Sequence, residues 1–288
     1  RTPTIQQLQA VVDNSNPLQQ STGNPDLKQQ TEHRLMLNYA ASNPDRGTFF
    51  LSMLTLNLAN DYIGSNTIYA SDSTVYQGIP LPAGSRLVVP ENLDGYYTFG
   101  SFLTYAFPVS PLKSNLNFNI FANYSNTPGL ISGIENVSNN FNYGLHLVLA
   151  SNISERLDFT LTSKSTWYQI GNTLNTNPNS TYSTLNTSGK LEWTIGPGIT
   201  THANLEYQTY NGFSVAGENA LVLLNMGLGK KLFADDRGEI QFAVYDVLGQ
   251  NSNISQTTTG NYIEENRTLA LTRYYLLSFT YRIKNFRT

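Results

Sequence analysis

Apolar and polar residues alternate along most of the chain after Glu32, with the period of two expected of a β-strand whose faces meet different surroundings. In the last such segment, the apolar face is formed by Tyr275, Leu277, Phe279, Tyr281 and Ile283, and the polar face by Ser278, Thr280, Arg282 and Lys284. The pattern predicts eleven strands, centred near residues 37, 54, 102, 119, 146, 161, 190, 204, 225, 242 and 279. Helical periodicity is expected only at Thr4–Val12, with Thr2 as the cap and Pro3 at the first helical position.

Short and long connections alternate between the predicted strands. The short turns are Asn43–Gly47, Pro108–Ser114, Asn152–Glu155, Gly196–Gly198 and Ala234–Gly238. The long connections are Asn60–Asp94, Ser125–Asn140, Gly171–Tyr182, Asn211–Glu218 and Gly249–Leu271. Outer-membrane barrels combine tight periplasmic turns with long outer loops. The sequence therefore predicts extracellular long loops, a periplasmic C-terminus, and a first strand that runs in the same direction as the last.

The composition narrows the class of protein. Only 13% of the 288 residues are charged, the formal net charge is -3, and Asn occurs 33 times. A soluble domain carries about 25% charged residues. The absence of cysteine excludes disulfide and thiolate-metal frameworks. The low charge without a basic cluster argues against a nucleic-acid binder, and the short apolar runs exclude helical membrane spans.

Alternation by itself does not say which face is outside, because soluble sandwiches and membrane barrels both alternate. Three features favour a membrane barrel: a polar face with few charges, strands of ten or more residues, and aromatic residues near strand ends. The aromatic residues expected at the turn side are Tyr105, Phe107, Trp193, Tyr281 and Phe286. Those expected at the loop side are Tyr97, Tyr124, Trp167, Tyr207 and Tyr275.

Eleven strands do not close an antiparallel bacterial barrel by themselves. Single-chain bacterial barrels have even numbers of strands, and an open edge in lipid leaves costly unpaired backbone groups. Either one strand is missed by the pattern or the chain is part of a larger barrel. We interpret residues 1–31 as an extracellular loop with a short helix and residues 32–288 as barrel strands, which favours the second alternative.

Several segments resemble the C-terminal barrel half of TonB-dependent outer-membrane receptors, specifically the Bacteroidetes outer-membrane β-barrel family. The resemblance covers essentially the whole chain and is carried by Thr2–Gln9, Asp13–Leu18, Gly23–Lys28, Tyr124–Gly129, Gly227–Phe233, Tyr245–Leu248 and Arg273–Tyr281. The Gly-Asn-Pro-x-Leu-Lys segment is fairly specific, although such receptors often continue it with Pro-Glu where this chain has Gln29 and Gln30.

The resemblance implies an all-β, antiparallel transmembrane β-barrel of about 22 strands, of which eleven are in this chain. It implies energised ligand uptake without a cofactor, with the plug and the TonB-contacting segment upstream of Arg1. Implied partners are outer-membrane lipid and lipopolysaccharide, TonB, and a surface lipoprotein or other complex subunits. The alternatives are a non-transporting structural or accessory subunit, and an adhesin or soluble β-rich secreted domain.

No catalytic motif is present, so we expect no enzymatic activity. The polar residues expected to line the lumen are His146, Lys164, Lys190, Glu192, His202 and Glu206. A hairpin centred on Pro197 would place Glu192 opposite His202, and Lys190 opposite Asn204. These residues predict a polar wall for a plug or ligand, or else an ion-pair ladder that fills the lumen. The hairpin offers no third ligand for a metal ion.

Ligand contact is expected on the long connections, because rigid scaffolds display recognition residues on loops. The connection Asn60–Asp94 holds acidic, basic and aromatic side chains suited to binding a sugar, a peptide or a siderophore. The candidate ligand-binding residues there are Asp61, Tyr62, Tyr69, Tyr76, Arg86 and Glu91. The alternative interpretation is an ordinary solvated loop.

Overall fold

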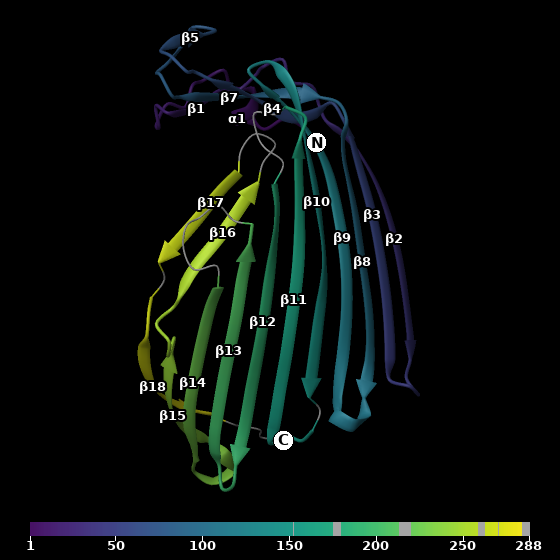
Figure 1. Ribbon diagram of the computed structural model, residues 1–288, viewed down its shortest axis with the longest axis vertical. Coiled ribbons are helices and arrows are strands. Elements are labelled where there is room, and N and C mark those ends of the chain that lie inside the picture. The colour runs from purple at the N-terminus through teal and green to yellow at the C-terminus, as the bar shows by residue number, and fades with distance from the viewer. Residues whose placement is uncertain (152, 175–179, 213–219, 259–262, 270, 284–288) are drawn as a thin grey trace.

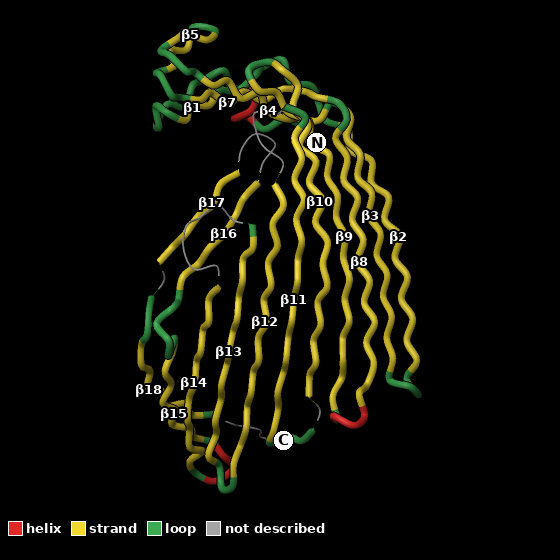
Figure 2. Tube along the Cα trace, in the orientation of Figure 1, coloured by secondary structure: helices red, strands yellow, loops and turns green. Residues whose placement is uncertain are grey.

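A curved antiparallel sheet of long strands dominates the molecule (Figures 1 and 2). The computed structural model describes residues 1–151, 153–174, 180–212, 220–258, 263–269 and 271–283. The strands of the long sheet are β2 (Thr31–Asn43), β3 (Thr48–Asn60), β8 (Tyr96–Val109), β9 (Ser114–Ile131), β10 (Ile134–Ser151), β11 (Leu157–Asn172), β12 (Ser180–Ile195), β13 (Ile199–Asn211), β14 (Ala220–Leu232), β15 (Gly238–Tyr245) and β18 (Tyr274–Tyr281). Their order in the sheet follows the chain, and all eleven predicted strands are confirmed.

Tight connections lie at one end of the sheet, which we call the turn end. Two of them contain short 3-10 helices, η1 (Ser110–Leu112) and η2 (Ala234–Asp236). The other three join β2 to β3, β10 to β11 and β12 to β13. We call the opposite end, where the longer connections lie, the loop end.

One predicted long connection is wrong. Ser125–Asn140 lies largely within β9 and β10, which pair up to Ile131 and Ile134 and leave a tight turn at Ser132 and Gly133. Polar cross-strand contacts support the extension: both the Tyr124 hydroxyl and Asn126 Nδ2 donate to Asn139 Oδ1, at 2.7 and 2.8 Å. A hairpin can therefore continue beyond its apolar stretch when its side chains pair with one another.

The connection Gly249–Leu271 also contains regular structure. It holds the antiparallel hairpin of β16 (Ser252–Thr258) and β17 (Ile263–Leu269). Parts of the predicted connections Gly171–Tyr182 and Asn211–Glu218 lie outside the described residues, as does Phe286.

The connection Asn60–Asp94 folds into a unit of its own, so its interpretation as an ordinary solvated loop is wrong. It contains β4 (Tyr62–Tyr69), β5 (Thr74–Tyr76), β6 (Ile79–Leu81) and β7 (Arg86–Leu93). The N-terminal segment adds β1 (Gln19–Ser21), which pairs in parallel with β7. We call residues 1–30 and 61–95 the cap, and Figure 1 shows it across the loop end of the sheet.

The cap has a small hydrophobic core. Leu81 and Leu87 are 1% and 0% exposed, and Tyr76 and Ile79 pack against the cluster. The buried members are Ile68, Ala70, Leu81, Leu87 and Val89. Burial of these side chains gives the cap a source of stability separate from the long sheet.

The N-terminal helix is shorter than predicted. Helix α1 spans Ile5–Leu8, so the expectation of a helix over Thr4–Val12 capped by Thr2 is wrong. Thr4 is the N-cap, and its side chain forms a capping box with Gln7. After this turn, the Gln9 and Gln7 carbonyls accept bonds from Gly23 and Asn24, which holds the segment extended against the cap. No helix among the described residues combines the length and apolar character needed for a membrane span.

The register across the sheet sorts the side chains onto an apolar and a polar face. One row of the apolar face runs from Leu277 through Phe242 and Leu228 to Thr201 and Trp193. Phe118 and Leu147 are opposite each other on this same face, and Phe279 is 58% exposed there. These three residues therefore do not pack together in a dry hydrophobic core. All described aromatic residues predicted for the strand ends are on the apolar face.

Both outer edges of the long sheet are unpaired among the described residues. Strand β2 pairs only with β3, and β18 pairs only with β15. Strands β2 and β18 are the first and last of eleven successive antiparallel strands, so they run in the same direction. Direct pairing of these edges would be parallel, so antiparallel closure requires an odd number of additional strands between them.

Candidate functional site

The six charged or histidine residues predicted for the polar wall share the polar face of the long sheet. The register places His146 opposite Lys164, Glu192 opposite His202, and Lys190 opposite Asn204. The two pairings predicted for the β12–β13 hairpin are thus confirmed. Glu206 lies two residues beyond Asn204 on the same face of β13.

Neutral amides form hydrogen bonds with two members of this group, Glu206 and His202. Asn204 Nδ2 donates to Glu206 Oε1 at 2.7 Å, and Gln241 Nε2 lies 2.7 Å from His202 Nδ1, which accepts. No ion pair of 4.0 Å or less joins Lys190, Glu192, His202 or Glu206 to one another. The predicted ion-pair ladder is therefore not formed.

Lys164 and His146 lie nearer the middle of the sheet. Lys164 Nζ is 5.6 Å from the centre of the Phe121 ring, a cation–π arrangement. The backbone carbonyl of His146 accepts from Asn119 Nδ2 at 3.0 Å. The ring of Phe121 covers Gly144, where a Cβ would lie about 2.5 Å from the ring.

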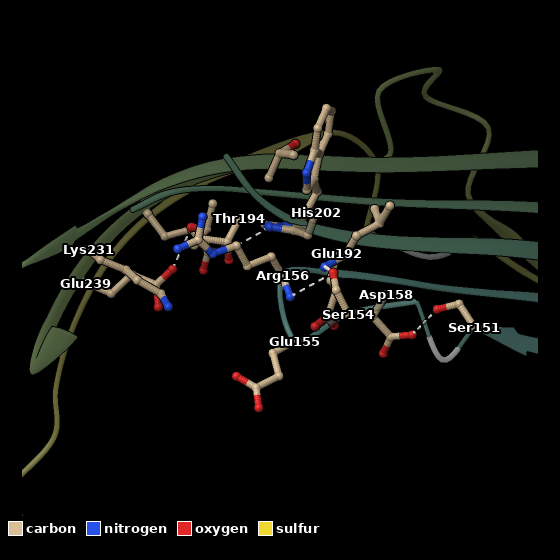
Figure 3. Close-up of a pocket in the computed structure, with 15 residues that line it drawn as sticks. Ser151, Ser154, Glu155, Arg156, Asp158, Glu192, Thr194, His202, Lys231 and Glu239 are labelled. Atoms are coloured by element: carbon tan, nitrogen blue, oxygen red, sulfur yellow. Dashed lines mark hydrogen bonds between the residues drawn. The ribbon is translucent and has the colours of Figure 1, made fainter. Parts of the chain in front are cut away.

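A cavity of about 640 Å³ lies at the turn end, and its lining residues come from β10 to β15 and their connections (Figure 3). Its lining includes the carboxylates Asp158, Glu192 and Glu239, together with His202 and Gln241. Hydrogen bonds orient two of the carboxylates: Ser151 donates to Asp158 and Thr200 donates to Glu239, both at 2.7 Å. The arrangement presents oriented acceptor groups to a ligand or polypeptide in the cavity.

Sequence reasoning missed the residues that position His202. Gly227 is opposite His202, and a Cβ at this glycine would overlap the imidazole ring. The glycine lets the ring lie across β14 and reach Gln241 on β15. A glycine at a polar-face position inside an alternating strand is the sequence signal for such close approach.

The six candidate ligand-binding residues are spread over the cap, with Tyr62 and Tyr69 at opposite ends of β4. Tyr62 stacks on Tyr96 with ring centres 4.2 Å apart, Tyr76 packs on the cap core, and Glu91 Oε1 accepts from Asn66 Nδ2 at 3.0 Å. The Asp61 carbonyl accepts from Asn92 Nδ2 at 2.8 Å. Tyr69 and Arg86 are paired across β4 and β7. Contacts within the cap thus involve several of these residues.

The cap has a cavity of its own, of about 640 Å³. It is lined by residues of 4–23 with Gly64, Ser65, Val88 and Pro90, and by none of the six predicted ligand-binding residues. Next to the long sheet, burial raises the pKa of the Tyr62 phenol above its usual value; Tyr96 adds to this rise and Arg1 opposes it. The neutral phenol is therefore the form suited to this packing.

The model of the outer membrane protein beta-barrel family matches residues 1–135 and 126–281. The chain belongs to this family. Comparison with curated proteins and with solved structures finds no match.

Membership of the outer membrane β-barrel family assigns the chain to the outer membrane and the apolar face to lipid. The spacing of the aromatic residues agrees: Tyr97 and Phe107 are ten residues apart on β8, about 33 Å along the strand. At a tilt of about 40° this corresponds to a height of about 25 Å, the usual apolar band of outer-membrane barrels. The polar face and its turn-end cavity then face away from lipid.

Proposed function

We propose that this chain forms the C-terminal barrel wall of a TonB-dependent receptor that imports a ligand across the outer membrane. The observation that carries the proposal is the open sheet, whose edges β2 and β18 have no further partner in the described part of the chain and run in the same direction. Such a sheet needs an odd set of further strands, as in a barrel of about 22 strands with eleven in this chain.

A barrel of that size also needs a plug, because its lumen is too wide for wall side chains to fill. The polar face offers carboxylate acceptors for such a plug at the turn-end cavity: Asp158 and Glu239, which hydrogen bonds orient, and Glu192. In this proposal, TonB acts on the plug, the cap and other long connections are extracellular, and the C-terminus is periplasmic. A surface lipoprotein would contact the cap.

The test is energy-dependent uptake in the native organism. We expect deletion of the gene to abolish growth on one scarce nutrient from a panel of sugars, peptides and iron chelates. Loss of TonB should give the same defect, and the intact gene should restore growth only when TonB is present. Uptake of the whole panel without this gene would contradict the proposal.

A second candidate function is an accessory subunit of an outer-membrane complex. The folded cap favours it, since a unit with its own buried core can act as a docking platform. Co-purification with a stable assembly, combined with unchanged uptake in the deletion strain, would support this function over transport.

A further inference from the structure

Lys230 is a charged residue on the apolar face of the long sheet. The register places it between Ile199 of β13 and Ile240 of β15, which are 42% and 41% exposed on that face. The next residue, Lys231, points to the opposite face and lines the turn-end cavity. Two adjacent lysines are therefore directed to lipid and to the polar side, respectively.

The depth of Lys230 corresponds to the headgroup layer. It lies two residues, about 6.6 Å of strand, beyond Leu228 toward the turn end. Leu228 shares a row with Thr201 and Trp193, and Trp193 belongs to the turn-side aromatic residues. Aromatic residues of this kind mark the membrane–water interface, so the Lys230 ammonium group extends past it.

The contacts of Lys230 leave its charge unneutralised. Its Nζ donates to the Pro197 carbonyl at 2.7 Å, and among the described residues no carboxylate lies within 4.0 Å of it. Lys231, in contrast, is paired with Asp236 at 3.2 Å. An ammonium group has three donors, so Lys230 keeps two for an anion at the membrane surface.

We propose that Lys230 binds the phosphate of an anionic glycerophospholipid in the leaflet at the turn end. Phosphate oxygens accept from the two remaining N–H groups, and the acyl chains pack over Leu228 and Phe242, one row nearer the middle of the membrane. The polar Pro197 carbonyl orients the ammonium group toward the headgroup layer. This site depends on the lipid-facing direction of the apolar face and not on whether the protein transports a ligand.

The test identifies the lipid beside Lys230. The whole outer-membrane protein, carrying the photo-reactive residue benzoylphenylalanine in place of Ile240, is reconstituted in vesicles of equal phosphatidylglycerol and phosphatidylcholine. After illumination, mass spectrometry of the peptide around residue 240 measures the ratio of the two lipids attached. We expect an excess of phosphatidylglycerol of about fivefold, the factor for one lysine at an anionic surface.

Lys230→Gln should bring the ratio to about one, whereas the matched control Lys231→Gln should leave it unchanged. Heat-dependent migration on gels verifies that each variant is folded. Equal attachment of both lipids in the unmodified background, or an excess that persists in Lys230→Gln, would overturn the site. Loss of the excess on addition of inorganic phosphate at constant ionic strength would also overturn it, because the site would then select free phosphate.

Discussion

Asn66 of β4 links the cap to Gly133 at the tip of the β9–β10 hairpin. Asn66 Oδ1 accepts from the Gly133 backbone amide at 3.1 Å, while its Nδ2 donates to Glu91 at 3.0 Å. The side chain is 4% exposed, and β4 also pairs in parallel with the end of β9. One buried amide therefore connects two units that are far apart in the sequence.

Asn66→Ala should loosen the cap. The substitution removes the hydrogen bonds of Asn66 to Gly133 and to Glu91, and a hydrogen bond of this kind contributes about 0.5–1.5 kcal/mol to stability. Hydrogen exchange of the β4 and β7 amides should become faster, with no change in β11 or β12. Asp72→Ala, at an exposed position of the cap, is the control, and equal protection in the two variants would contradict the role of Asn66.

Leu277→Arg and Ser278→Arg test which face of β18 meets lipid. Leu277 is opposite Phe242 on the apolar face and is 69% exposed, whereas Ser278 is opposite Gln241 on the polar face. We expect Leu277→Arg to cost about 2–4 kcal/mol of folding free energy in a bilayer. Ser278→Arg should have little effect in the same membrane-refolding titration. Equal losses would mean that the faces are assigned incorrectly.

Gly227→Ala should displace His202. The new methyl group would overlap the imidazole and break its contact with Gln241, and we expect a loss of about 1–3 kcal/mol of stability. In a His202→Ala background the same change should cost much less, because the overlapping ring is gone. A denaturant titration of the two single variants and the double variant measures this coupling. Strictly additive losses would show that the ring does not set the cost.

The cap should lose stability at alkaline pH through Tyr62. Burial raises the pKa of this phenol in the folded cap above the usual value of about 10. Its contribution is therefore complete below pH of about 10 and is lost as the pH rises through the folded-state pKa. Absorbance of tyrosinate should show a late-titrating group that is missing in Tyr62→Phe. Titration of that group together with exposed tyrosines would contradict the burial effect.

The strand pattern could be predicted because it depends on neighbouring residues. Alternation in segments such as Asn115–Tyr124 reflects the two faces of a strand, and the β12–β13 register follows from the tight turn at Pro197. The pairing of Glu192 with His202 was therefore accessible from the sequence. The partners of these side chains were not, since Gln241 lies 39 residues from His202 along the chain.

The failed predictions share a physical cause. The polar residues of Ser125–Asn140 suggested a loop, yet their side chains bond to one another across β9 and β10. The polar residues of Asn60–Asp94 suggested an ordinary solvated loop, yet Tyr76 and Glu91 contact other parts of a folded cap. Polar composition indicates contact with water or with polar partners, and only the fold distinguishes the two.

The sequence by itself determined the strand number, the two faces and the outer-membrane class, because these follow from alternation along the chain and from composition. The tertiary structure decided the cap, the turn-end cavity and the bond of Lys230 to the Pro197 carbonyl. Contacts such as Gln20 with Pro80 and Asn24 with Pro90 join residues 60 or more positions apart. Such contacts have no local periodicity, so they exist only once the long sheet brings the two segments to the same end.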